Sequence, residues 1–256
     1  MKKVKLVFPE HENPVVQAAV EQCSDRVESL KAGDLVEACE LVNRGKAEGL
    51  VAGIDYTSRE VILACRDGIG IEKKTFSACF VMTKGKKAVI LADTAACKNP
   101  NEEQLFEIVC QTYETALATL EDEPKIAMLS FSTLGSGGKD ASIDKIRAVL
   151  ARLHAEKPHI KVDGEMQLDA AVNEQIGWKK APNSAVAGQA NVLICPDLNS
   201  GNILYKALEQ FGGWTAAGPI LQGFKRPCSD LSRGSTVEDV VAVILNLEKI
   251  IRSKNG

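Results

Sequence analysis

Three residues near the end of the chain have the types and spacing needed for chemistry on an anionic substrate. Ser232 and Arg233 lie in a glycine turn, and Asp239 follows in the first turn of the predicted last helix. An arginine in such a turn can clamp a phosphate or stabilise a developing oxyanion, and a nearby carboxylate can accept a proton. Asp239 also has capping-box spacing from Thr236, so a structural role for this carboxylate stays open.

A second candidate is the polar segment 130–139, which follows a predicted strand and contains hydroxyls, glycines and one lysine. Its backbone N–H groups and the side chains of Ser132, Thr133 and Ser136 predict an anion-binding loop. The segment lacks the glycine spacing of a Walker P-loop. A flexible polar surface turn is the alternative interpretation.

Two more segments place polar side chains after predicted strands. Residues 196–206 open a helix with glycine, asparagine and serine donors, which favours an anion near Asn202, Tyr205 and Lys206. An ordinary capped helix is the alternative there. Residues 163–169 hold three carboxylates that could bind a metal or act as acid and base. With no histidine or further carboxylate nearby, we interpret them as helix caps or supporting structure.

The composition is that of an ordinary globular protein and excludes several classes. The 256 residues are 45% hydrophobic and 25% charged, with a net charge of −3. This excludes a mainly disordered chain and argues against a nucleic-acid binder that relies on a basic surface. No stretch approaches the roughly 20 apolar residues of a membrane span, and the first apolar run is too short for a signal peptide. The eight cysteines lack zinc-ligand spacing, so we expect no metal and reduced thiols in a cytoplasmic protein.

Strand-like and helix-like segments alternate along the chain. The predicted strands are 4–8, 49–53, 76–82, 88–92, 126–130, 160–162 and 192–195. The predicted helices are 14–23, 35–42, 58–66, 102–120, 142–153, 169–176, 202–211 and 237–251. The alternation predicts an α/β fold with mainly parallel sheets, plus one hairpin around Gly85. Such sheets bind ligands at the carboxyl ends of their strands, where the candidate segments follow.

Six segments in the second half of the chain form a recognisable set in order and spacing. They are Met128-Leu129-Ser130-Phe131-Ser132-Thr133, Val162-Asp163-Gly164-Glu165-Met166-Gln167-Leu168-Asp169-Ala170-Ala171, Lys180-Ala181-Pro182-Asn183-Ser184, Gly201-Asn202-Ile203-Leu204-Tyr205-Lys206, Gly218-Pro219-Ile220-Leu221-Gln222-Gly223 and Ser229-Asp230-Leu231-Ser232-Arg233-Gly234. From about Phe76 to Val243 the chain resembles the phosphate acetyltransferase (phosphotransacetylase) family of phosphate acyltransferases. The last two segments resemble the acetyl branch more than the butyryl branch.

The resemblance implies reversible transfer of an acyl group between coenzyme A and phosphate. Matched position by position, Asp239 falls on the family's base for the coenzyme A thiol, and Ser232 and Arg233 fall on the residues that assist the acyl phosphate. A base near the thiol produces the thiolate that attacks the carbonyl. The resemblance also implies coenzyme A as a substrate, no permanently bound cofactor or metal, and a homodimer.

The N-terminal part departs from the family pattern. The family usually carries several tens more residues where this chain has only about Leu30 to Gly49. In the next family motif, Thr57, Ser58 and Arg59 take substrate-binding positions, whereas the phosphate-binding arginine falls on Leu63. Either Arg59 or Arg66 could replace it. A coenzyme A-binding homologue with impaired catalysis and a regulatory or interaction role therefore stays open as the alternative.

A third interpretation, a metal-dependent decarboxylating dehydrogenase of similar architecture, would need a carboxylate cluster for a divalent metal and a nucleotide-binding loop, and the sequence shows neither. We predict two three-layer α/β/α domains with a ligand cleft between them. The first would combine residues 1–72 with 224–256, and the second would span 73–223.

Overall fold

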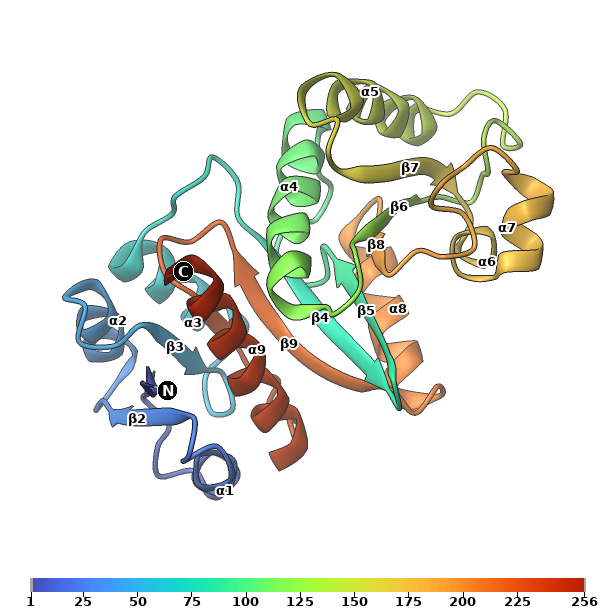
Figure 1. The fold of residues 1–256 in the computed structure, drawn as a ribbon. Coiled ribbons are helices and arrows are strands. Elements are labelled where there is room, and N and C mark those ends of the chain that lie inside the picture. The colour runs from blue at the N-terminus through green and yellow to red at the C-terminus, as the bar shows by residue number, and fades with distance from the viewer. Residues whose placement is uncertain (1, 256) are drawn as a thin grey trace. The chain divides into compact units, whose positions relative to one another are not determined.

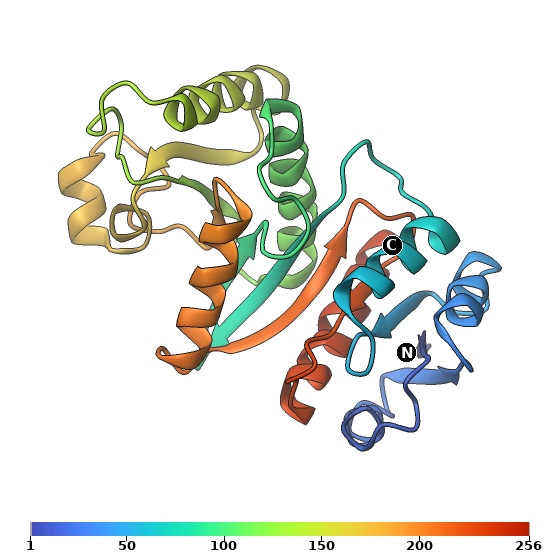
Figure 2. The same ribbon diagram turned by 180° about the vertical axis from the view of Figure 1, so that it is seen from behind.

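The computed structural model describes residues 2–255, and the chain divides into two compact units. The first unit combines Met1–Phe76 with Thr215–Gly256, and the second is Ser77–Trp214. Each unit contains a sheet with helices against both faces (Figures 1 and 2).

The sheet of the first unit is mostly parallel. Its strands follow the order β2-β1-β3-β10-β9. The paired strands among β1, β2, β3 and β10 are parallel to one another, and β9 is antiparallel to β10. The bounds are β1 (Val4–Phe8), β2 (Val27–Lys31), β3 (Gly49–Ala52), β9 (Thr215–Gln222) and β10 (Cys228–Asp230).

Two groups of helices cover this sheet. Figure 1 looks onto the face that carries α9 (Val237–Asn255), which packs against α1 (Pro14–Gln22). Figure 2 looks onto the face that carries α3 (Ser58–Ala64), which packs near α2 (Leu35–Asn43) and the π-helical turn Cys65–Ile69. Glu248 of α9 is buried and pairs with Arg26 at 2.6 Å and Arg252 at 2.7 Å, which ties α9 to the residues before β2.

The second unit is built in the same way on the order β4-β5-β8-β6-β7. β4 and β5 form an antiparallel hairpin, and the other pairs are parallel. Its strands are β4 (Ser77–Lys84), β5 (Lys87–Ala92), β6 (Lys125–Leu129), β7 (Lys161–Met166) and β8 (Val192–Ile194). Its helices are α4 (Glu102–Thr119), α5 (Ala141–Glu156), α6 (Leu168–Val172), α7 (Glu174–Lys180) and α8 (Leu198–Gln210).

The predicted α/β class is confirmed, and so are several local signals. Asn13, Asp34 and Asn101 each accept a hydrogen bond from a backbone N–H in the first turn of the helix that they precede, as their sequence positions predict. The predicted hairpin around Gly85 is also present.

Three strands are missing from the prediction, and two helices differ. β2 exposes most of its residues, β9 contains Gly218-Pro219, and β10 has only three residues, so none has a clear strand pattern. The predicted helix 169–176 is two helices, α6 and α7, with Asn173 between them. α8 begins at Leu198 instead of 202, because Asp197 caps it.

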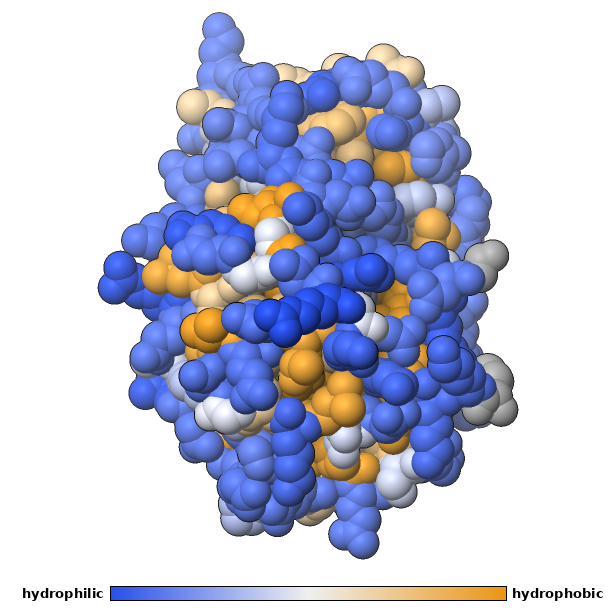
Figure 3. All heavy atoms as spheres, turned by 90° about the vertical axis from the view of Figure 1, so that its left-hand side faces the viewer, coloured by the Kyte–Doolittle hydropathy of each residue, from blue (hydrophilic) through white to orange (hydrophobic). Residues whose placement is uncertain are grey.

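Hydrophilic residues cover most of the face shown in Figure 3, with hydrophobic patches among them. Within residues 2–255, the exposed large hydrophobic side chains lie almost entirely in the second unit, among them Leu117, Trp178 and Phe211, and Val36 is the one in the first unit. None of the helices in that range is long and apolar enough to cross a membrane.

Candidate functional site

The loop between β10 and α9 presents Ser232 and Arg233 on the surface of the first unit. Both residues are exposed. The turn is closed by a 2.9 Å hydrogen bond from Ser235 N to Ser232 O, and Ser232 Oγ accepts a longer one from Gly234 N. The Arg233 guanidinium has no protein partner within residues 2–255. It is therefore available to an anionic ligand.

Asp239 caps α9 and keeps one carboxylate oxygen uncommitted. Its Oδ2 accepts hydrogen bonds of 2.9 Å from both Thr236 N and Thr236 Oγ1, and Thr236 Oγ1 accepts one from Asp239 N. The capping role that the sequence left open is thus confirmed. Asp239 Oδ1 has no hydrogen-bond partner among the described residues, and the residue is only half-buried. A role as a base stays a prediction.

The loop between β3 and α3 is organised by the buried carboxylate of Glu10. This carboxylate accepts hydrogen bonds from Gly53 N at 2.8 Å, Asp55 N at 2.5 Å and Tyr56 N at 3.2 Å. Thr57 caps α3 and donates from Oγ1 to Glu60 Oε2 at 2.7 Å. The Thr57 hydroxyl is therefore committed to the helix cap.

The two arginines that could replace Leu63 differ in their contacts. Arg66 makes a bidentate ion pair with the neighbouring Asp67, at 2.7 and 3.1 Å. Arg59 is exposed and has no partner within residues 2–255. Arg59 also follows Ser58 directly, so an anion at this loop could meet both side chains.

Asp230 lies at the end of β10, directly before the Leu231-Ser232-Arg233 loop. Its side chain is fully buried, and neither carboxylate oxygen has a hydrogen-bond partner. Burial raises the pKa of Asp230 to about 6, the Ser58 hydroxyl opposes that rise, and the Glu10 carboxylate adds to it. Asp230 was part of a motif in the sequence, but no local signal indicated its burial.

In the second unit, the loop 130–139 is folded around the buried carboxylate of Glu165. Glu165 Oε1 accepts hydrogen bonds from Ser132 Oγ at 2.8 Å and from Gly135 N at 2.7 Å. Arg147 Nε donates to Glu165 Oε2 at 3.0 Å. Burial would raise the pKa of Glu165, but these donors outweigh burial and the pKa is lowered.

The expected open cradle of backbone amides is not present in this loop. The N–H groups of residues 132–138 all donate to acceptors within the protein: Ser130 Oγ, Ser136 Oγ, Glu165 O, Glu165 Oε1, Thr133 O, Ser132 Oγ and Gly135 O. The hydroxyl of Thr133 donates to Gln167 Oε1 at 3.3 Å and also accepts from Gln167 N. The Glu165 carboxylate accepts from Gly135 N and from the Ser132 hydroxyl, two donors that the sequence assigned to a ligand anion.

The three residues predicted on α8 have different surroundings. Asn202 Nδ2 donates weakly to Thr94 O at 3.4 Å, and the buried Tyr205 ring stacks on Phe80 with centroids 4.1 Å apart. Lys206 Nζ lies 4.8 Å from the centroid of the Tyr205 ring. The cap of α8 is satisfied by Asp197, which accepts from Ser200 N and Ser200 Oγ. Lys206 is thus the cation of this group that a ligand could reach.

The carboxylates of segment 163–169 have structural partners. Asp169 pairs with Lys180 at 2.8 Å, and Asp163 accepts from Gly164 N at 2.8 Å. Neither is a helix N-cap, since Gln167 precedes α6 and makes no side-chain cap. The capping interpretation is therefore wrong, and the supporting role is filled by Glu165. Within residues 2–255 no group of three or more His, Cys, Asp or Glu side chains could hold a metal ion.

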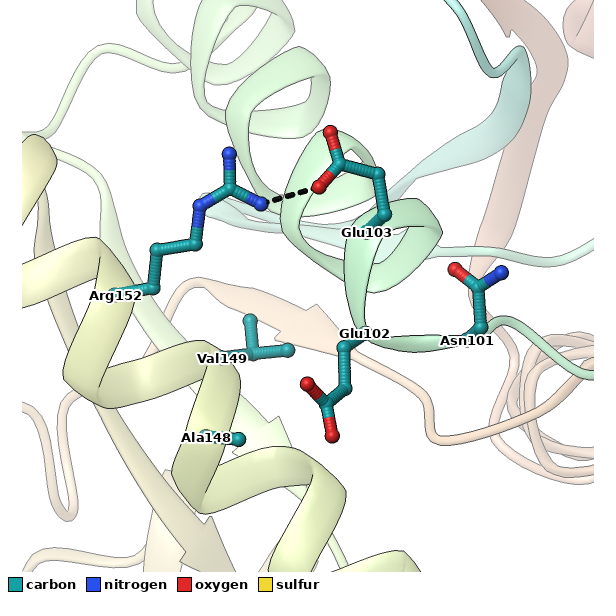
Figure 4. Close-up of a pocket in the computed structure, with 6 residues that line it drawn as sticks. All are labelled: Asn101, Glu102, Glu103, Ala148, Val149 and Arg152. Atoms are coloured by element: carbon teal, nitrogen blue, oxygen red, sulfur yellow. Dashed lines mark hydrogen bonds and ion pairs between the residues drawn. The ribbon is translucent and has the colours of Figure 1, made fainter.

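Among the cavities lined by residues 2–255, two in the second unit bear on ligand binding. One of about 330 Å³ lies at the carboxyl ends of β6 and β8, and its lining includes Ser130, Phe131, Cys195 and Ser200. The other, of about 470 Å³, lies between α4 and α5 (Figure 4). Its Arg152 is already paired with Glu103 at 2.5 Å, so this second cavity lacks a free cation for an anionic ligand.

Comparison with known proteins decides the family. The model of the family described as "Phosphate acetyl/butaryl transferase" matches residues 24–246. This chain belongs to the phosphate acetyl/butaryl transferase family. The matched range includes Ser58, Asp230, Arg233 and Asp239.

Several proteins and several solved structures are similar to this member of the phosphate acetyl/butaryl transferase family. The phosphate acetyltransferase of Treponema pallidum is 41% identical over 215 residues, which are 80% of this chain and 64% of that protein. That of Clostridium acetobutylicum is 39% identical over 231 residues, 86% of this chain and 68% of that protein. The chain thus spans about two thirds of the length of these relatives. A phosphotransacetylase structure from Streptococcus pyogenes superposes with a TM-score of 0.87 at 30% identity, covering 99% of this chain and 95% of that one.

Proposed function

We propose that this chain is a phosphate acyltransferase that moves an acetyl or other short acyl group reversibly between coenzyme A and phosphate. Family membership supports the reaction class. The observation that carries the proposal is the exposed Arg233 guanidinium, which is unpaired within residues 2–255 and lies on the loop leading to the half-buried Asp239 carboxylate. These groups supply the cation and the base that the reaction needs.

In the proposed reaction, Asp239 takes the proton of the coenzyme A thiol. A free thiol has a pKa of about 8.5, so a base increases the thiolate fraction at neutral pH. The thiolate sulfur attacks the carbonyl carbon of the acyl phosphate, the C–O bond to phosphate breaks, and phosphate leaves with the bonding electrons. Arg233 and Ser232 stabilise the negative charge on the carbonyl oxygen and the leaving phosphate.

The remaining predicted residues would bind the substrates. Ser58 and Arg59 supply donors for the phosphate group in the first unit, with Thr57 holding their helix. Lys206 supplies a cation in the second unit, and Asn202 and Tyr205 support it. Ser132, Thr133 and Ser136 would shape the loop 130–139, since the first two hydroxyls donate to Glu165 and Gln167 and the third accepts from Thr133 N.

Coenzyme A is a substrate in this proposal, and no permanently bound cofactor takes part. We further propose that the chain works as a homodimer in the cytoplasm. Size-exclusion chromatography with light scattering tests the dimer, and a monomeric active enzyme would contradict it.

The direct test is an assay of purified protein with coenzyme A and acetyl phosphate, following thioester absorbance. We expect turnover in the wild type and in Arg44→Ala, an exposed arginine of the same unit. We expect a loss of at least about a hundredfold in Arg233→Ala. Absence of turnover with every short acyl phosphate would contradict the proposal, and so would full activity in an Asp239→Ala, Arg233→Ala double variant.

The alternative of a coenzyme A-binding protein without catalysis is motivated by Leu63, which replaces an expected arginine. It predicts binding of coenzyme A in a calorimeter without turnover in the assay. The unpaired Arg59 favours the enzyme, because it leaves a cation at the same loop.

A further inference from the structure

One buried acid differs from all the others in residues 2–255. The other buried carboxylates are Glu10, Asp93, Glu165 and Glu248. Glu10 and Asp93 each accept hydrogen bonds from three backbone N–H groups, Glu165 binds a hydroxyl, an amide and an arginine, and Glu248 pairs with two arginines. Asp230 has no partner for either oxygen. An unpaired buried carboxylate is costly, so its retention calls for an explanation.

The position of Asp230 connects two loops of the proposed site. Leu231 N donates to Ala52 O at 2.5 Å, which fixes the end of β10 beside the end of β3. A side chain added at Gly53 would come within 2.8 Å of Asp230 Oδ1, so the Gly53 backbone lies directly against this carboxyl. α3, which begins at Ser58, packs against β10, which ends at Asp230, and the Ser58 hydroxyl lowers the pKa of Asp230.

Among the groups around Asp230, the Ser58 hydroxyl is the one that can turn to donate to it, although the structure shows no hydrogen bond to either carboxylate oxygen. Glu10, after β1, has its oxygens engaged with the amides of the 53–56 loop. Cys65, in the π-helical turn, is a buried thiol whose own pKa is raised well above the usual range, chiefly by its contact with Cys228. Neither supplies a cation to Asp230. Ser58 is also exposed, so its hydroxyl can reach a ligand as well as the buried carboxyl.

A serine hydroxyl has one proton, and it can donate in only one direction at a time. If the carboxyl beside Ser58 is ionised, it attracts the hydroxyl proton inward, and the oxygen lone pairs then face a ligand. If the carboxyl carries a proton, it can donate to Ser58 Oγ, and the hydroxyl proton is free to point at a ligand oxyanion.

We propose that Asp230 is a positioning residue that sets the direction of the Ser58 hydrogen bond and so controls how tightly the Ser58 loop holds an oxyanion. The proposal rests on the proposed function, because it takes Ser58 as part of the phosphate-binding loop. Asp230 itself does not touch the ligand. It acts by releasing or withholding the Ser58 proton.

This arrangement couples anion binding to proton uptake. Since the pKa of Asp230 is raised to about 6, the carboxyl is protonated below that pH and ionised above it. Anion affinity should therefore fall as the pH rises through about 6 to 7.5, by about tenfold. Inorganic phosphate changes its own charge in this range, whereas sulfate does not, so sulfate is the cleaner probe.

The test is calorimetric titration of the full chain with sodium sulfate at several pH values between about 5.5 and 8. In the wild type we expect the affinity for sulfate to fall about tenfold across this range, with proton uptake detected in buffers of different ionisation enthalpy. In Asp230→Asn the amide donates to Ser58 at every pH, so the affinity should stay at the low-pH value of the wild type. In Ser58→Ala it should be weak at every pH.

Controls separate this effect from other titrations. His11 is the histidine of this unit, so His11→Gln should keep the wild-type pH dependence. A wild type with pH-independent sulfate affinity would overturn the inference, as would the same pH dependence in Asp230→Asn. If Asp230→Asn fails to fold, Ser58→Ala decides, because wild-type affinity and pH dependence in that variant would overturn the inference as well.

Turnover with coenzyme A and acetyl phosphate is scored separately. Turnover together with pH-independent sulfate binding leaves the proposed function standing and removes the role of Asp230. If the pH dependence is lost in Asp230→Asn but the wild type shows no turnover, the role of Asp230 in anion binding stands and the proposed function is removed. The two failures are therefore distinguishable.

Discussion

The Ser132 hydroxyl donates a 2.8 Å hydrogen bond to the buried carboxylate of Glu165, and this contact fixes the loop after β6. The same hydroxyl oxygen accepts from Gly137 N at 2.8 Å. Ser132 therefore joins a strand end, a glycine turn and a carboxylate of β7. The sequence predicts that Ser132 binds a ligand, whereas in the structure its hydroxyl stabilises the conformation of its own loop.

Replacing Glu165 should disorder this loop and destabilise the second unit. Glu165→Gln removes the charge that Arg147 and Gly135 N contact, so we expect a loss of about 2–4 kcal/mol in the free energy of unfolding. Because the pKa of Glu165 is lowered, its contribution is present at neutral pH and is lost as the pH falls below about 4.5. Urea unfolding at neutral and acidic pH measures both effects. Glu156→Gln on the exposed face of α5 is the control, and an equal loss there would contradict the role of Glu165.

Asp230 should make the wild type less stable as the pH rises. Its pKa is raised to about 6 in the folded state from an ordinary value of 3.8, so the folded protein binds the extra proton between these values. Stability from this residue is complete below about pH 4 and falls by up to about 3 kcal/mol as the pH passes through 6. The difference between wild type and Asp230→Asn in urea unfolding isolates this slope. Parallel stability curves for the two proteins would show that the carboxyl does not titrate in this way.

The double role of Asp239 can be separated by two variants. Asp239→Asn keeps an oxygen that can accept from Thr236 and removes the base, so we expect kcat to fall about 10²- to 10⁴-fold with little change in Tm. Thr236→Ala weakens the same cap, so it should cost about 1 kcal/mol of stability and reduce kcat far less. Steady-state kinetics and thermal melts on both variants make the comparison. Similar kinetics in the two variants would assign Asp239 to capping alone.

The unpaired Arg59 should matter more for the phosphate group than the paired Arg66. Losing one charge-assisted contact costs about 1.5–3 kcal/mol, so Arg59→Ala should raise the KM for acetyl phosphate at least about tenfold. Arg66→Ala breaks an exposed ion pair with Asp67 and should change that KM little. KM values at saturating coenzyme A test this order. A larger effect in Arg66→Ala would reverse the assignment.

Gly53 should tolerate no side chain. A Cβ there would lie 2.4 Å from Leu231 O and 2.5 Å from Leu231 N, and the residue has a φ of +124°. Gly53→Ala should therefore cost more than about 3 kcal/mol, because β3 and β10 would have to separate. Gly45 also has a positive φ, but nothing lies within 4 Å of its Cβ position, so Gly45→Ala should cost only about 1–2 kcal/mol. Equal losses in the free energy of unfolding of the two variants, measured in urea, would show that backbone strain alone sets the cost and that the contact with Leu231 adds nothing.

Three helix starts were predictable from the sequence because their signals are local. Asn13, Asp34 and Asn101 cap the helices that they precede, because an N-cap needs only its own side chain and the next few backbone N–H groups. The edge strand β2 and the short β10 could not be predicted, since their hydrogen bonds come from distant strands. β10 joins the sheet because β3 offers it a pairing edge on one side and β9 offers one on the other.

At the candidate site, neighbouring residues alone were enough to predict that Ser232 and Arg233 lie in a turn before a capped helix. Glycine and a capping threonine within four residues are enough to specify such a turn. The sequence also predicts a short helix that begins at about Ser58, so Arg59 lies in its first turn, as the structure confirms. These features depend on neighbouring residues, so tertiary packing changes them little.

Which polar side chains already have hydrogen-bond partners, and which are left for a ligand, depends on contacts between residues far apart in the sequence. The sequence predicts that the Ser132 hydroxyl binds a ligand, but in the structure it donates a hydrogen bond to a glutamate 33 residues away. Asp230 looked like an ordinary polar residue of a motif, yet the pairing of β10 with β3 removes its carboxyl from water without giving it a donor. Desolvation depends on every element packed around a group, so it cannot be read from the residues on either side of it.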